Sequence, residues 1–162
     1  PFFEHFYAGG INSVRGFKQN TLGPRATPSL YVLDSQGNPV LDENGNPIFN
    51  PYAYRDDRSI GGAYLFEGGF DLIFKLPFLE DQRSVRTSMF IDVGNVFAKD
   101  CGDTSININC SELDLGELRY SFGVGVTWIT QLGPMSLAIT SPGNKGPLDK
   151  TEGFQFEIGT QF

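Results

Sequence analysis

The sequence has no long apolar run. Within its 162 residues, no apolar segment approaches the roughly 18 residues that a transmembrane helix requires. This excludes helical membrane spans, but transmembrane strands need only about 9–11 residues each and alternate apolar with polar side chains. The chain also starts at Pro1 with no methionine, charged leader or apolar signal segment, so we expect it to be a piece of a longer protein.

Basic residues are scarce beside acidic ones. The chain has 12 Lys and Arg against 19 Asp and Glu, a net charge of −7. A nucleic-acid-binding domain usually carries a basic patch, and none is visible, so we do not expect nucleic acid as a partner. The single histidine, His5, has no evident Ser or Cys nucleophile arrangement. We therefore expect neither an enzyme nor a cofactor.

Cysteine is also rare, with Cys101 and Cys110 in one polar segment. Two cysteines cannot make a four-ligand zinc site, and His5 is far away in the sequence, so no metal site is expected. A loop-closing disulfide is the favoured interpretation and implies an oxidising, extracytoplasmic setting. Two free thiols are the alternative.

What the sequence does contain is typical of strands and turns. It has 15 Phe, 6 Tyr, 20 Gly and 10 Pro, and aromatic residues favour strands while Gly and Pro interrupt them. Alternation with period two predicts five strands. On each strand one face carries large apolar residues and the other carries Gly, Ser, Thr and charged residues. The predicted strands are residues 63–76, 84–97, 118–128, 134–141 and 154–162.

The connections between these strands alternate in length: long before the first strand, then short, long, short and long. Membrane barrels have short turns at the periplasmic end and longer loops at the outer end. The sequence therefore predicts an all-β, antiparallel transmembrane β-barrel wall, with a soluble sandwich as the alternative. Lipid cannot satisfy open sheet edges, so we expect further strands before Pro1.

Residues 1–62 lack this alternation and read as an ordered loop followed by a long polar excursion. Residues 34–40 and 42–48 echo each other, each with Gly-Asn-Pro after an Asp, which suits tight turns. A calcium loop is the alternative, but neither copy has the glycine and distal glutamate of an EF-hand.

One cation in this loop has candidate partners on the strands. Arg15 lies in the stretch Val14-Arg15-Gly16-Phe17. Three carboxylates share the small, polar strand face that would point into a barrel. Because a guanidinium suits carboxylates, the loop could dock in the lumen. The alternative is an exposed Arg15 above a hydrated lumen. The three carboxylates are Glu67, Asp71 and Asp92.

Short motifs lie at residues 7–10, 14–17, 20–24, 84–88, 91–97, 132–134 and 153–159. Together these motifs resemble the bacterial surface antigen family of outer-membrane insertases. The resemblance implies a sixteen-stranded barrel in which residues 1–62 are the sixth extracellular loop and residues 63–162 the last five strands. It also implies POTRA domains, which this chain lacks, and a loop arginine docked on acidic wall residues, here Asp92 and Asp71. Glu67 is added from face geometry.

The implied activity is the folding and insertion of client proteins into the bacterial outer membrane without ATP. The implied partners are the lipid bilayer, client outer-membrane proteins and, mainly through the POTRA domains, assembly lipoproteins. The last strand would form a weak lateral seam, where Gly159 loosens the strand or relieves crowding. A two-partner-secretion translocase, which shares the arginine stretch, and a passive porin-like barrel are the alternatives. The seam residues are Phe154, Phe156, Ile158, Gly159 and Phe162.

Overall fold

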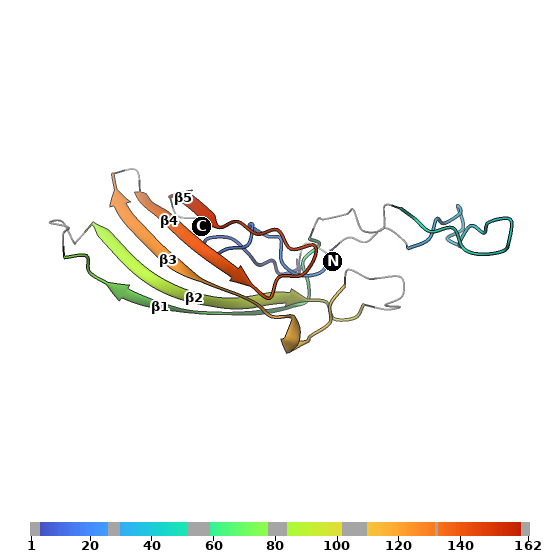
Figure 1. The fold of residues 1–162 in the computed structure, drawn as a ribbon, viewed down its shortest axis with the longest axis horizontal. Coiled ribbons are helices and arrows are strands. Elements are labelled where there is room, and N and C mark those ends of the chain that lie inside the picture. The colour runs from blue at the N-terminus through green and yellow to red at the C-terminus, as the bar shows by residue number, and fades with distance from the viewer. Residues whose placement is uncertain are drawn as a thin grey trace.

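The computed structural model describes residues 4–25, 30–51, 59–77, 84–101, 110–131 and 133–159. Five strands form one antiparallel sheet in chain order, curved into a wall (Figure 1). A short 3-10 helix, η2 (Leu115–Glu117), precedes the third strand. No helix in the described part of the chain has the length and apolarity that a bilayer crossing requires. The strands are β1 (Tyr64–Phe74), β2 (Val85–Phe97), β3 (Arg119–Thr130), β4 (Gly133–Gly143) and β5 (Phe154–Ile158).

The five predicted strands are confirmed, with differences at their ends. β3 and β4 run further than the alternation indicated, and they pair from Tyr120–Gly143 to Thr130–Gly133. β5 is shorter, because it stops at Ile158 and Gly159 takes a φ of +92°, a left-handed conformation that ends regular strand geometry. Residues 160–162, and with them the predicted seam residue Phe162, lie outside the described residues.

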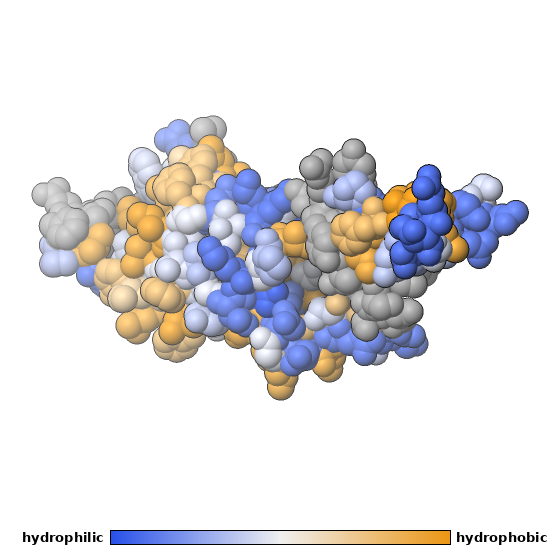
Figure 2. Space-filling model, turned by 45° about the vertical axis from the view of Figure 1, so that its right-hand side comes forward, coloured by the Kyte–Doolittle hydropathy of each residue, from blue (hydrophilic) through white to orange (hydrophobic). Residues whose placement is uncertain are grey.

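The two faces of the sheet differ as the alternation predicted. Large apolar side chains on one face are exposed, for example Phe70 at 66% and Ile91 at 58%. Hydrophobic residues gather over the strand-containing half of the molecule (Figure 2). In a soluble sandwich this face would be covered by a second sheet, and nothing in the described part of the chain covers it. The arrangement matches a wall whose outer face contacts lipid.

The connections between consecutive strands lie alternately at the two ends of the sheet. The β1–β2 and β3–β4 connections lie at one end of the sheet, and the β2–β3 and β4–β5 connections lie at the other (Figure 1). β3 and β4 are joined through residues 131–132, whereas residues 98–118 join β2 to β3. The β1–β2 and β4–β5 connections, residues 75–84 and 144–153, are equal in length, so the predicted contrast between the two ends rests on the β2–β3 and β3–β4 connections.

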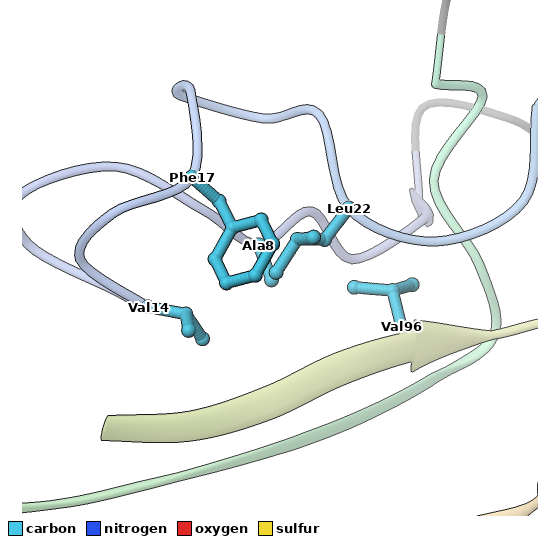
Figure 3. Packing of buried hydrophobic residues seen from close by; sticks show 5 residues of the cluster. All are labelled: Ala8, Val14, Phe17, Leu22 and Val96. Carbon is cyan, nitrogen blue, oxygen red and sulfur yellow. The ribbon is translucent and has the colours of Figure 1, made fainter. Parts of the chain in front are cut away.

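Residues 4–25, here called the strap, lie along the concave face of the sheet (Figure 1). The core of the molecule lies between the strap and β2. Five side chains point toward one another there (Figure 3), and none is more than 1% exposed. The strap is therefore packed onto the wall as part of the fold. The core residues are Ala8, Val14, Phe17, Leu22 and Val96.

Residues 30–50, here called the arm, project beyond the long-loop end of the sheet (Figure 1). Three residues spaced along the arm form a closed ring of backbone hydrogen bonds: Val32 N–H donates to Ile48, Ile48 to Val40, and Val40 to Val32, at 2.8–2.9 Å. In each of the two turns between them an aspartate accepts backbone N–H bonds, and no metal-ligand cluster occurs among the described residues.

Candidate functional site

Arg15 reaches two carboxylates on neighbouring strands of the concave face. Its Nε donates to Asp92 Oδ2 at 2.7 Å and its Nη2 to Asp92 Oδ1 at 2.8 Å. Its Nη1 and Nη2 donate to Asp71 Oδ1 and Oδ2 at 3.1 and 3.0 Å. The backbone N–H of Arg15 also donates to Asp92 Oδ2, at 3.1 Å. Each carboxylate thus receives a two-pronged fork, the strongest geometry for this pair.

The arginine is more deeply enclosed on its Asp92 side. Side-chain exposure is 16% for Arg15, 5% for Asp92 and 38% for Asp71. The ring of Phe90 lies against the guanidinium, with its centroid 3.5 Å from Cζ, which adds a cation–π contact. Burial alone would lower the pKa of Arg15, but the hydrogen bonds to Asp92 and Asp71 raise it above its ordinary value. Arg15 is therefore a fixed positive charge.

Glu67 is not brought to the arginine, and its assignment as a receptor is corrected. No hydrogen bond or ion pair joins Glu67 to Arg15 in the described part of the chain. In the β1–β2 register Glu67 lies opposite Gly94. Val14 lies directly over that glycine, since a Cβ there would be 2.8 Å from Val14 Cγ2. Because Val14 covers the Glu67–Gly94 pair, the Arg15 side chain extends toward Asp71 instead.

The two residues after Arg15 are held by one side chain of β5. Gly16 N–H donates to Gln155 Oε1 at 3.0 Å, and Gln155 Nε2 donates to the Phe17 carbonyl at 2.8 Å. Gly16 has a φ of +91°, and a Cβ there would lie 2.9 Å from Thr140 Oγ1. Glycine is therefore needed at this position both for its conformation and for the close approach to the wall.

Ser121 of β3 lies under Gly16 of the strap. It is fully buried, and its hydroxyl has no hydrogen-bond partner among the described residues. A Cβ at Gly16 would come within 3.3 Å of Ser121 Cβ. The site therefore uses the small size of Ser121, which lets the strap seat close to the sheet.

The strap also pairs with the β4–β5 connection like an added strand. Residues 16–18 run antiparallel to residues 150–152, joined by two backbone hydrogen bonds of 2.9 and 2.8 Å. Nearer the start of the strap, Asn12 Nδ2 donates to Glu157 Oε2 of β5 at 2.7 Å. The strap thus spans the wall from β1, through Asp71, to β5.

A second charged cluster, here called the clasp, lies at the end of the strap and consists of Arg25, Arg119 and Asp149. Asp149 Oδ2 accepts from Arg119 Nε and, at 2.6 Å, from Gly146 N–H. Asp149 Oδ1 lies 3.7 Å from Arg25 Nη2. Side-chain exposure is 3% for Arg25, 11% for Arg119 and 8% for Asp149. Arg119 Nη1 also donates to the Glu117 carboxylate at 2.9 Å.

Cys101 and Cys110 are joined by a disulfide with an S–S length of 2.05 Å. Cys110 lies beside the clasp, where it lines a cavity of about 300 Å³ together with Arg25 and Asp149. The residues between the two cysteines, 102–109, lie outside the described residues. The disulfide therefore closes the β2–β3 loop next to the clasp.

The predicted seam strand presents its apolar residues outward. Phe154, Phe156 and Ile158 are 60%, 49% and 56% exposed. A Cβ at Gly159 would have no atom of the described residues within 4 Å, so crowding by those residues does not account for this glycine. Its φ of +92° favours the other interpretation, a break in the strand.

Sequence reasoning missed several residues of the site. The alternation within the predicted strands puts Phe90, Arg119 and Gln155 on the same face as Asp92, but alternation alone does not assign partners to them. Arg25 and Asp149 were not singled out, because both lie in segments without periodicity. The sequence shows Arg25 and Asp149 as a cation and a carboxylate in two different loops. It does not show that these two loops meet in the folded protein.

The curved sheet has an apolar outer face and an arginine-bearing strap on its concave face. These features define the class of protein, an outer-membrane β-barrel, of which the sheet forms part of the wall. The whole chain, residues 1–162, matches the model of the Omp85 superfamily domain. The chain therefore belongs to the Omp85 superfamily, and it is an outer-membrane β-barrel protein.

Individual relatives agree. The chain is 35% identical over 176 residues to the outer membrane protein assembly factor BamA of Neisseria meningitidis serogroup B, covering 100% of this chain and 19% of that protein. The crystal structure of BamA from Haemophilus ducreyi lacking POTRA domains 1-3 matches with a TM-score of 0.71 and 29% identity, covering 96% of this chain and 27% of that chain. This chain thus spans about a fifth of the curated relative, and the family predicted from its motifs is confirmed.

Proposed function

We propose that the chain is the C-terminal part of an outer-membrane insertase, which folds and inserts client β-barrel proteins without ATP and without enzymatic chemistry. Residues 1–62 are the sixth extracellular loop and residues 63–162 the last five strands of a sixteen-stranded barrel. The POTRA domains belong to the protein outside this chain. The observation that chiefly supports this is the Arg15–Asp92 lock in a chain 35% identical to an assembly factor.

The seam of this insertase is the edge of β5. β5 pairs with β4 over five residues, whereas β3 and β4 pair over the eleven positions from Tyr120 to Thr130. A short strand that ends at a glycine holds its neighbour weakly, and an unpaired edge can template an incoming strand by β-augmentation. The strap keeps this weak strand in place, because Gln155 and Glu157 of β5 both bind it.

The partners follow from this role. The exposed apolar face contacts the lipid bilayer, and client outer-membrane proteins meet the seam. Assembly lipoproteins bind mainly through the POTRA domains. No cofactor takes part, because strand pairing and apolar burial supply the driving force for insertion.

The test uses the whole protein reconstituted in liposomes, with the rate of client-barrel insertion measured in the absence of nucleotide. Arg15→Ala removes both forks and leaves Asp92 buried without its partner, so insertion should slow and the barrel should lose resistance to heat. Lys145→Ala is the control, because Lys145 is an exposed loop cation with no hydrogen bond or ion pair to the described residues. Unchanged insertion and heat resistance in Arg15→Ala would contradict the proposal, whereas export of a soluble passenger would favour the translocase.

A further inference from the structure

We propose that the clasp of Arg25, Arg119 and Asp149 is a second lock of the strap, separate from Arg15, and that its task is to position β5. Its consequence for client insertion rests on the function proposed above. The position of β5 is a property of the fold and can be measured independently of that function.

Three segments far apart in the sequence meet at the clasp. Arg25 ends the strap, Arg119 is the first residue of β3, and Asp149 lies in the β4–β5 connection. Asp149 is itself fixed in a closed turn, because its N–H donates to the Gly146 carbonyl at 3.2 Å and its Oδ2 accepts from Gly146 N–H. The carboxylate is thus held at one place and cannot follow either arginine.

The charges make Asp149 the member that joins the other two. Two arginines, 3% and 11% exposed, approach its two carboxylate oxygens. Without the negative charge, Arg25 and Arg119 would both lose the buried carboxylate that lies between them, and their positive charges would repel each other in a poorly hydrated site. A neutral isostere at this position should therefore separate the strap from the β4–β5 connection, although the side-chain volume is kept.

Any shift of Asp149 is passed directly to β5. The next residues, 150–152, pair with residues 16–18 of the strap, and the Gly153 carbonyl accepts from Thr140 N–H at 2.9 Å. β5 begins immediately afterwards and contributes Gln155 to the strap. The chain between the clasp and the seam strand is thus paired along its whole length and has no slack.

The two locks hold different strands. Arg15 fixes the strap to β1 and β2 through Asp71 and Asp92. The clasp fixes the strap to β3 and to the approach to β5. Because the two sets share no residue, loss of the clasp should loosen β5 while β1 and β2 stay paired.

The test measures backbone hydrogen exchange by mass spectrometry in the whole protein reconstituted in liposomes. In Asp149→Asn, we expect amides of residues 150–158 to exchange about tenfold faster or more, and those of residues 64–74 to be unchanged. Arg25→Gln should have the same effect, and Arg25→Lys, which keeps the charge, should restore most of the protection. Lys145→Gln removes a charge from the same connection and should change nothing. Client insertion should slow in Asp149→Asn and in Arg25→Gln.

Each outcome separates the clasp from the proposed function. Unchanged exchange of residues 150–158 in a folded Asp149→Asn protein would overturn the clasp, and so would an equal increase over β1. Failure of Arg25→Lys to restore protection would also overturn it, since charge would then not be the cause. If the wild-type protein inserts no client, the proposed function fails, while the exchange comparison still decides for or against the clasp.

Discussion

At the scale of single residues, burial decides which contact of Arg15 matters most. The guanidinium forks both carboxylates with similar distances. Asp92 is nearly closed off from solvent, whereas Asp71 is more than a third exposed. An exposed ion pair contributes about 0–1 kcal/mol, while loss of one partner from a buried pair costs about 3–5 kcal/mol.

Two matched substitutions should therefore differ. Asp92→Asn should lower the free energy of unfolding by about 3 kcal/mol or more, because Arg15 is left buried without its main counter-charge. Asp71→Asn should lower it by no more than about 1 kcal/mol, because water already screens that pair. Urea unfolding of the whole protein in liposomes measures both. Equal losses in the two variants would show that burial does not rank the contacts.

The sequence predicted the type of this site better than its exact partners. Alternation placed Asp92, Asp71 and Glu67 on one face, and the family resemblance pointed to the first two. Selection among residues on one face depends on where the strap crosses the strands, and that is fixed by Val14 over Gly94 and by core packing. Neither is a periodic pattern, so Glu67 could not be excluded in advance.

At the scale of elements, the strands and the arm depend on different sequence features. Strand existence followed from alternation, but the end of β5 at Ile158 is set by the backbone conformation of Gly159. The arm depends on turn chemistry, since Asp34 and Asp42 each accept two backbone N–H bonds at 2.8–2.9 Å. Such turns are local and can be predicted from the sequence. The ring of backbone hydrogen bonds that closes the arm joins residues far apart in the sequence and cannot be predicted in this way.

The arm should loosen in acid. Backbone hydrogen bonds, led by Asn38 for Asp34 and by Asn46 for Asp42, lower the pKa of both carboxyls below the ordinary value of 3.8. A lowered folded-state pKa means that the stabilisation is complete above 3.8 and is lost as the pH falls through the lowered value. Carboxyl ¹³C NMR titration of the whole protein should give midpoints below 3.8 for both residues. Midpoints at or above that value would show that the turns do not hold the carboxylates.

At the scale of the whole molecule, the fold is inverted relative to a soluble sheet protein. The large apolar residues of the wall face outward and are exposed, and the buried residues lie between the strap and the small, polar concave face. This arrangement is stable where lipid covers the outer face, because the bilayer removes that surface from water. The same sequence pattern is therefore ambiguous until the strap and its arginine are placed on the concave face.

A pair of lysine substitutions on β3 tests this orientation. Val124 lies near the middle of the strand on the exposed apolar face, 44% exposed, whereas Thr127 lies on the concave face and bonds to Ser136 at 3.2 Å. Val124→Lys should cost about 2–4 kcal/mol of stability in a bilayer, because the ammonium would be placed near the bilayer midplane. Thr127→Lys faces the water-filled side and should cost about 1 kcal/mol or less, mainly the lost hydrogen bond. Urea unfolding in liposomes measures both, and a larger loss in Thr127→Lys would mean that the concave face, and not the apolar face, meets the lipid.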